Sequence, residues 1–446
     1  MNKNVVVIHP VLTRSKTGDE GAVRKFERNP DAALEEAIGL AHAIDLVIVH
    51  TEIVRLKTAT PATLIGSGVV ERIKSMIVER DAGLVFVDDA LSPVQQRNLE
   101  KEWNCKVIDR TGIILEIFGA RARTSEGRLQ VELAALNYQR TRLVKAWSHL
   151  ERQRGGGGFL GGPGEKQVEL DRRMIDDRIK RLKVDLEGVK QNRRIQRESR
   201  KREPYPVIAL VGYTNAGKST LFNRITGAEV FAKDLLFATL DTTMRGIKLP
   251  SGKKAILSDT VGFISELPTH LVAAFRATLE EVQDAAVILH VRDISQENTE
   301  AEKEDVLAIL QDLGIDSEKD ERIIEVLNKI DRLAGRERAA LINRSKRQEK
   351  TAVVSALTGA GIDNLLKTID GLLGKDQQVV HADISLADGK ALAWLYRRGH
   401  VIERKDDEEF AHVRVGLEPA DIERFAAQFP YALNKAKPKK KKLKSS

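Results

Sequence analysis

Residues 206–219 read PVIALVGYTNAGKS, and this stretch decides the fold of the central part of the chain. The apolar run 206–211 predicts a short strand, and residues 219–226 predict a helix. Between them lies the pattern G-x-x-x-x-G-K-S, in which backbone N–H groups cradle phosphate oxygens. Lys218 then reaches the β- and γ-phosphates, and Ser219 offers a hydroxyl to Mg²⁺. We therefore predict a phosphate-binding loop made by Gly212, Tyr213, Thr214, Asn215, Ala216, Gly217, Lys218, Ser219 and Thr220.

A second motif, DTVG, follows a predicted strand that ends at residue 258. A carboxylate at a strand end after a phosphate loop holds Mg²⁺, here Asp259, and Gly262 allows the backbone to approach the γ-phosphate. The motif predicts a second group of nucleotide-binding residues: Asp259, Thr260, Val261 and Gly262.

A third motif, NKID, follows the strand predicted at 323–327, and the run VVSAL stands at 353–357. Asp331 can accept two hydrogen bonds from N1–H and the exocyclic amine of guanine, whereas adenine presents no such donor pair. Asn328 supports the base edge, the Lys329 stem can lie over the ring, and residues 353–357 place backbone near the guanine oxygen. The predicted base site is Asn328, Lys329, Ile330, Asp331, Ser355, Ala356 and Leu357. Together the motifs predict a GTP-binding domain over 204–374, with a mostly parallel sheet and Mg²⁺ as cofactor.

Residues 1–110 alternate short apolar runs with helical stretches, which predicts a small parallel α/β domain. His9, His42 and His50 are scattered, and we interpret them as ordinary structural or surface residues.

Residues 111–203 follow a helical period instead. Leucines at 129, 133, 136 and 143, and a second apolar series from Ile175 to Val189, predict two helices packed antiparallel as a coiled coil. Between them, residues 155–164 hold seven glycines and are flanked by basic side chains. This Gly-rich loop is either a flexible turn or a thin tip that enters an RNA groove.

The whole chain has 446 residues, of which 42% are hydrophobic and 31% charged. No apolar run reaches the ~18 residues of a spanning helix. The single cysteine, Cys105, excludes a disulfide framework and indicates the cytosol. Residues 378–433 predict a small α+β domain. Residues 434–446 predict a disordered tail whose lysines account for most of the net charge of +8 and could tether the protein to RNA or an anionic lipid surface.

The stretches GGPGEKQVELDRR (161–173), DRTGIILEIFGARARTSEGRLQVELA (109–134) and FATLD (237–241) resemble signatures of the HflX family, a group of translation-factor-related GTPases. The resemblance implies a factor that binds the large ribosomal subunit and its rRNA and splits ribosomes under stress, with the hairpin reaching toward the peptidyl-transferase centre. It also implies that the first switch lies at Phe237, Ala238, Thr239, Leu240 and Asp241.

By this resemblance Thr239 is the switch residue that binds Mg²⁺ and senses the γ-phosphate, so that the expected metal ligands are Ser219, Thr239 and Asp259. Where the family reads D-P-T-T-R, this chain has DTTMR at 241–245, which leaves Thr242 and Thr243 as alternatives to Thr239. We favour Thr239.

The residue after Gly262 is Phe263, where many GTPases place a glutamine that orients the attacking water. We therefore expect slow intrinsic hydrolysis that is activated from outside, by the ribosome or by K⁺ bound at Asn215. Alternatively, Asn215 only stabilises its loop by a local hydrogen bond. No catalytic residue is assigned beyond transition-state stabilisation by Lys218 and Thr239; Arg245 and Arg276 are candidate arginine fingers.

Three hypotheses follow: a ribosome-splitting GTPase, a GTPase acting on precursors of the large subunit, or a non-catalytic GTP-dependent RNA-binding module. We expect a cytoplasmic monomer without a transmembrane segment and without a DNA partner. Association of the basic tail with a membrane is a further option.

Overall fold

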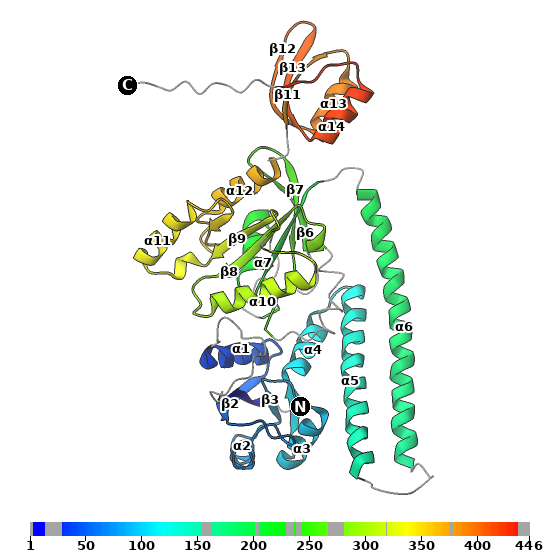
Figure 1. Cartoon of the computed structure of the whole chain (residues 1–446), viewed down its shortest axis with the longest axis vertical. Coiled ribbons are helices and arrows are strands. Elements are labelled where there is room, and N and C mark those ends of the chain that lie inside the picture. The colour runs from blue at the N-terminus through cyan, green and yellow to red at the C-terminus, as the bar shows by residue number, and fades with distance from the viewer. Residues whose placement is uncertain are drawn as a thin grey trace.

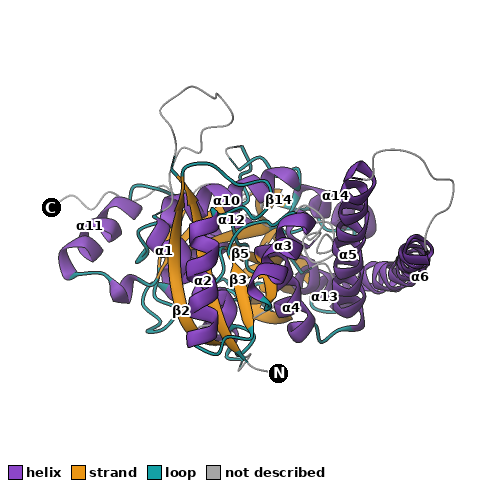
Figure 2. Ribbon diagram, turned by 90° about the horizontal axis from the view of Figure 1, so that it is seen from below, coloured by secondary structure: helices purple, strands orange, loops and turns teal. Residues whose placement is uncertain are grey.

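The computed structural model describes residues 3–13, 29–153, 163–200, 205–228, 236–237, 243–265, 281–317, 319–374 and 378–435. The molecule is elongated (Figure 1). An N-terminal α/β domain lies at one end, a six-stranded domain (the G domain) in the middle and a small C-terminal domain at the other end. Two long helices run alongside, which Figure 2 shows standing to one side of the sheets. This is the multidomain α/β architecture that the sequence predicts.

The N-terminal domain is a parallel sheet in the order β2-β1-β3-β4. Alternate side chains of the buried run Val5 to Ile8 face opposite sides: Val5 and Val7 pack with α1 and α4, and Val6 and Ile8 pack with α2 and α3. Helices therefore cover both faces, as parallel sheets require. The elements are β1 (Asn4–Leu12), α1 (Pro30–His42), β2 (Val47–Leu56), α2 (Ser67–Glu79), β3 (Leu84–Val87), α3 (Pro93–Trp103), β4 (Lys106–Asp109) and α4 (Arg110–Arg121).

Helix α4 corrects the predicted start of the hairpin at residue 111. Its side chains from Ile113 to Phe118 are mostly buried, and it packs against both the N-terminal domain and the G domain because it is apolar on most of its surface. The hairpin is formed by α5 (Ser125–Gln153) and α6 (Pro163–Arg200). Ile179, Leu182 and Leu186 are buried along α6, as the coiled-coil spacing predicts. The predicted Gly-rich tip falls largely outside the described residues.

The G domain has the strand order β10-β9-β8-β5-β7-β6, parallel except for β6. The sheet has helices on both faces. α10 packs on one face, and α7 and α12 pack on the other. The elements are β5 (Val207–Gly212), α7 (Lys218–Thr226), β6 (Thr243–Lys248), β7 (Lys254–Asp259), β8 (Val287–Asp293), α10 (Thr299–Asp312), β9 (Ile323–Asn328), the 3₁₀ helix η1 (Ile330–Arg332), α11 (Gly335–Ser345), β10 (Thr351–Val353) and α12 (Ile362–Gly374).

One apolar core runs without interruption from the N-terminal domain into the G domain. Ile114 and Phe118 of α4 belong to the same cluster as Val211 of β5 and Phe263. Phe118 meets Phe237 edge-on, with ring centroids 4.7 Å apart. The G domain is therefore packed against the N-terminal domain on the side where its phosphate loop lies.

The C-terminal domain alternates strands and helices as β-α-β-β-α-β, with the antiparallel sheet order β12-β13-β11-β14. Residues Asn434 and Lys435, which the sequence places in the tail, form β14, because their backbone pairs with the edge of β11. The rest of the predicted tail lies outside the described residues. The elements are β11 (Gln378–Ser385), α13 (Gly389–Arg398), β12 (His400–Asp406), β13 (Phe410–Leu417), α14 (Pro419–Gln428) and β14 (Asn434–Lys435).

No helix in the described part of the chain is both long and apolar enough to cross a membrane.

Candidate nucleotide-binding site

The predicted phosphate loop joins the end of β5 to the start of α7 and exposes backbone N–H groups at a helix N-terminus. Gly217, the residue before α7, has φ of 91°, and Asn215 has φ of 58°. A Cβ atom at position 217 would lie 2.3 Å from Nδ2 of Asn328, so only glycine fits. The loop therefore has the left-handed turns that aim successive N–H groups at one anion.

Lys218 is buried at the bottom of this loop. Its Nζ donates to the carbonyl oxygens of Gly212 (3.0 Å) and Tyr213 (2.8 Å). Burial lowers the pKa of Lys218 to about 8, and the Asp259 carboxylate opposes that shift. The ammonium group is thus held in place by carbonyl oxygens before any phosphate arrives.

Two oxygen donors lie where a magnesium ion would be needed. Ser219 donates its hydroxyl to Oδ2 of Asp259 at 2.8 Å, and Asp259 is fully buried at the end of β7. A hydroxyl beside a carboxylate is a set of hard oxygen ligands that suits Mg²⁺. These two residues therefore fit the metal that the motifs imply.

The segment after Asp259 lies against the phosphate loop. The Thr214 N–H donates to the Phe263 carbonyl (2.7 Å), and the Phe263 N–H donates to the Gly212 carbonyl (3.1 Å). A Cβ atom on Gly262 would lie 3.0 Å from Nζ of Lys218, which explains why glycine stands there. The Phe263 side chain is buried in the core, so it does not reach into the site to orient a water.

The residues predicted to recognise the base converge from two strand ends and one loop. The buried Asn328 donates to the Ala216 carbonyl (2.9 Å) and accepts from the Ala356 N–H (3.0 Å). It therefore ties three of the predicted motifs together. Asp331 accepts a hydrogen bond from the Ser355 hydroxyl at 2.5 Å, which fixes one oxygen of the carboxylate.

Two residues that the sequence reasoning missed complete this end of the site. Asp293 ends β8 and forms an ion pair with Lys329, 2.8 Å between Oδ2 and Nζ. Arg224 of α7 donates to the carbonyl oxygens of Ala356 (3.1 Å) and Leu357. An acidic residue at the carboxyl end of a strand next to β5 was the available signal for Asp293.

The first switch is only partly within the described residues. Phe237, predicted as a pocket residue, is instead buried between the N-terminal domain and the G domain. Ala238, Thr239, Leu240, Asp241 and Thr242 lie outside the described residues, as does Arg276. Thr243, the remaining alternative ligand, pairs with Asp259 across β6 and β7, and Arg245 is exposed on β6.

The remaining predicted residues lie on the same elements. Thr220 is half-buried on α7, whereas Thr260, Val261 and Ile330 are buried, and Leu357 is exposed beside the base site. Together these groups offer a phosphate cradle, two metal donors and a carboxylate for guanine at one edge of the sheet.

Family models match four consecutive stretches of the chain. They are described as GTP-binding GTPase N-terminal (31–119), GTP-binding GTPase middle region (121–200), 50S ribosome-binding GTPase (207–329) and HflX C-terminal domain (340–431).

Relatives named GTPase HflX are similar over most of their length. The protein from Magnetococcus marinus is 48% identical over 395 residues, which is 89% of this chain and 90% of that protein. The protein from Escherichia coli K12 is 44% identical over 368 residues, 82% of each chain. A solved structure of SsGBP with GDP aligns with 83% of this chain and 98% of its own, at 25% identity and a TM-score of 0.46.

Proposed function

Because the chain belongs to the HflX family and is therefore a GTPase, we propose that it binds the large ribosomal subunit and separates stalled ribosomes into subunits. The observation that carries the proposal is the match of residues 207–329 to a family described as 50S ribosome-binding GTPases. GTP serves as the signal, because the γ-phosphate is present before hydrolysis and absent after it.

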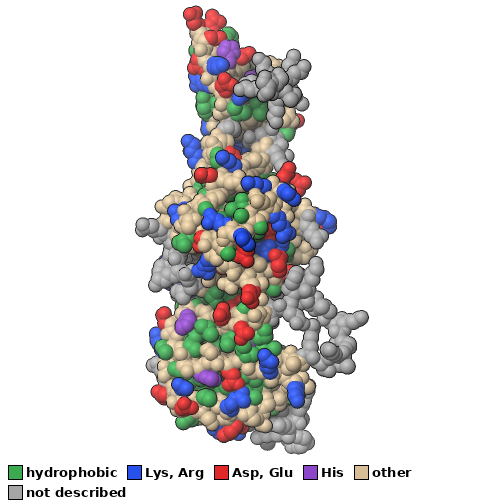
Figure 3. All heavy atoms as spheres, turned by 90° about the vertical axis from the view of Figure 1, so that its left-hand side faces the viewer, with side chains coloured by type: hydrophobic (Ala, Val, Ile, Leu, Met, Phe, Trp, Pro, Cys, Tyr) green, Lys and Arg blue, Asp and Glu red, His purple; other side chains and the backbone are tan. Residues whose placement is uncertain are grey.

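A basic surface on the G domain supports contact with RNA. Helix α11, at the left in Figure 1, has no buried residue. With the residues just after it, this helix carries five cations and one acid: Arg336, Arg338, Arg344, Lys346, Arg347 and Glu337. On the face shown in Figure 3, Lys and Arg side chains gather over the middle of the molecule. Phosphate groups of rRNA are the natural partner for such a surface.

Within the site, we assign the phosphates to the loop 212–220 and to Lys218, which also stabilises charge in the transition state. Asp331 selects guanine. Ser219, Asp259 and Thr239 would hold Mg²⁺, which supplies positive charge to the phosphates. Asn215 is the proposed K⁺ ligand, since its side chain is exposed in the phosphate loop, and a local hydrogen bond that stabilises the loop is the alternative role.

Hydrolysis is proposed to be slow until the ribosome activates it, because Phe263 points into the core. Because the chain belongs to a family of GTPases, the hypothesis of a non-catalytic GTP-dependent RNA-binding module is excluded. A GTPase acting on precursors of the large subunit is the competing outcome of the experiment.

The test is light scattering of intact ribosomes mixed with the protein and a non-hydrolysable GTP analogue. A fall in scattering that GDP does not produce is expected, and Asp331→Asn provides a matched control that should act only with a xanthosine nucleotide. Binding to free large subunits or their precursors without any fall would contradict splitting and favour the assembly role.

A further inference from the structure

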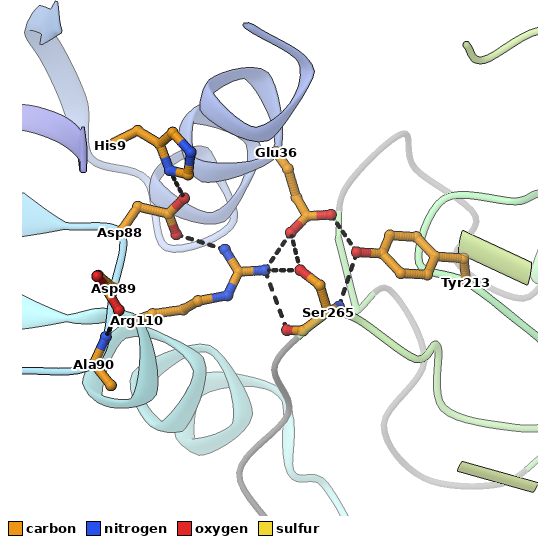
Figure 4. Close-up of polar contacts among 8 residues, drawn as sticks. All are labelled: His9, Glu36, Asp88, Asp89, Ala90, Arg110, Tyr213 and Ser265. Carbon is orange, nitrogen blue, oxygen red and sulfur yellow. Dashed lines mark hydrogen bonds and ion pairs between the residues drawn. The ribbon is translucent and has the colours of Figure 1, made fainter. Parts of the chain in front are cut away.

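A cluster of polar side chains joins the N-terminal domain to the G domain beside the nucleotide site (Figure 4). Arg110, the first residue of α4, donates to the hydroxyl (2.6 Å) and the carbonyl (3.3 Å) of Ser265. It also forms ion pairs with Glu36 of α1 and with Asp88 at the end of β3. Tyr213 donates its hydroxyl to Glu36 and accepts the Ser265 N–H at 2.8 Å. We call Glu36, Arg110, Tyr213 and Ser265 the interdomain clamp.

Three of the four clamp residues are buried, and the Glu36 side chain is 13% exposed, so most of the hydrogen bonds of the clamp are shielded from water. Arg110 and Ser265 are each 5% exposed, and Tyr213 is 4% exposed. Burial by itself lowers the pKa of Arg110, but the carboxylates of Asp88 and Glu36 outweigh it and keep the guanidinium charged. A charged donor makes stronger hydrogen bonds than a neutral one.

Both G-domain members of the clamp sit in or next to loops that are predicted to contact the phosphates. Tyr213 is in the phosphate loop, and Ser265 follows Gly262 by three residues. The clamp therefore acts on the same two segments that the backbone hydrogen bonds of Phe263 already join. It holds the segment 261–265 against the phosphate loop, where Gly262 approaches Lys218 closely.

We propose that Glu36 and Arg110 are positioning residues for the GTP reaction. Through Tyr213 and Ser265 they hold the segment 261–265 against the phosphate loop, in a position from which the γ-phosphate must displace it. Lys218 and the Gly262 backbone are the groups that receive the γ-phosphate. Entry of a phosphoryl group between them moves Gly262 outward and pulls Ser265 away from Arg110. GDP lacks this group and leaves the clamp closed.

The residue before Arg110 extends the clamp to the hairpin. The buried Asp109 carboxylate accepts from the Tyr138 hydroxyl (2.5 Å) and from Arg142, both on α5. It also caps α4 through the Gly112 N–H (2.8 Å). The N-terminal domain and α5 are thereby held together, so a displacement of Arg110 is transmitted through Asp109 to α5.

The test uses Ser265→Ala and Tyr213→Phe, which remove one hydroxyl each and leave the buried ion pairs of Arg110 intact. Dissociation constants for GDP and for a non-hydrolysable GTP analogue are measured with Mg²⁺ present. The Ser265 hydroxyl accepts from Arg110 and donates to Glu36 (3.0 Å), and the Tyr213 hydroxyl likewise makes two hydrogen bonds. One lost hydrogen bond corresponds to about 2- to 10-fold in an equilibrium constant, so two correspond to about 4- to 100-fold. We expect each variant to favour the GTP analogue over GDP by about that factor relative to wild type. In Ser265→Ala, which lies outside the phosphate loop, the affinity for GDP should stay nearly constant.

Two further measurements distinguish a positioning role of the clamp from a merely structural one. Steady-state hydrolysis by Ser265→Ala should show a lower KM for GTP with little change in kcat. Hydrogen exchange over 31–42 and 110–121 should be faster with the GTP analogue than with GDP in wild type, but equally fast with both nucleotides in the variants.

The matched control is Ser251→Ala, which removes a serine hydroxyl that donates to the Asp370 carboxylate (2.6 Å) at the far end of the G domain. It should leave the nucleotide preference unchanged. Wild-type preference in both clamp variants, or a shift toward GDP, would overturn the proposal. No ribosome is present in these measurements, so their outcome is independent of the proposed partner.

Discussion

The substitution Asp331→Asn tests the assignment of guanine recognition. In the structure, Ser355 donates to one oxygen of Asp331, which orients the carboxylate at the edge of the base site. Guanine offers two N–H donors to this carboxylate, and each hydrogen bond to a charged acceptor is worth about 1.5–3 kcal/mol. Losing the pair costs about 3–6 kcal/mol, or roughly 10²- to 10⁴-fold in affinity for GTP.

The introduced amide side chain offers one donor group and one acceptor, a pattern that matches xanthine, whose C2 carries an oxygen in place of the amine. Competition of GTP and XTP against a fluorescent guanine nucleotide measures both effects in wild type and Asp331→Asn. Ser355→Ala serves as the control. This substitution removes the hydrogen bond that orients the carboxylate but leaves its two acceptor oxygens in place. The affinity for GTP should therefore fall by about 10-fold or less, and the affinity for XTP should not increase. GTP affinity equal to wild type in Asp331→Asn, or no gain for XTP, would refute the assignment.

The remaining predictions concern charge, packing and the hairpin. The pKa of Lys218 is about 8 in the folded protein, below its value in the unfolded chain. Between pH 8 and 10.5 the unfolded state therefore binds more protons than the folded state. The free energy of unfolding of the ligand-free protein should accordingly increase as the pH rises through that window. The bound phosphates need the charged form, so GTP binding should take up a proton above pH 8, which calorimetry in two buffers of different ionisation enthalpy detects. Asn328→Ala leaves two buried backbone groups unsatisfied and should lower the free energy of unfolding by about 2–5 kcal/mol in urea titrations. Tyr138→Phe removes a hydrogen bond to Asp109 and should speed hydrogen exchange in the first half of α5, with the exchange of α12 as an internal reference.

Each of these predictions has an outcome that contradicts it. Proton uptake that persists unchanged in Lys218→Ala would show that another group titrates. An Asn328→Ala protein as stable as wild type would mean that water replaces both lost partners. Unchanged exchange of α5 in Tyr138→Phe would show that Arg142 alone fixes the hairpin to Asp109.

The sequence places the motifs of the candidate nucleotide site at the strand ends where the structure has them, because these motifs are local. Each of the segments at 212, 259 and 328 combines a strand end with the loop that follows it, and parallel strands bring such ends to one edge. Asp293 could not be predicted as a site residue, because a single acidic residue at a strand end does not form a recognisable motif. The fold nevertheless places Asp293 beside Lys329.

What the sequence does not predict is the packing between distant segments. Phe237 lies in a stretch that resembles a switch, yet its ring is buried against Phe118, more than a hundred residues away. The sequence pattern assigns helix α4 to the hairpin because nothing in that pattern shows that two domains enclose the helix. Arg110 looks like any surface cation until Glu36, Asp88 and Ser265 surround it.

The continuous core has a consequence for how the molecule melts. Ile114 and Val211 belong to one apolar cluster that the two domains share, although each domain also has an apolar cluster of its own on the other face of its sheet. Unfolding of either domain therefore exposes core that belongs to both. Calorimetry should therefore give a single heat-capacity peak for the N-terminal domain and the G domain together, with the C-terminal domain, whose apolar cluster is separate, as the only independent cooperative unit among the described residues. A fragment cut before β5 would expose this interior on both pieces and would tend to aggregate.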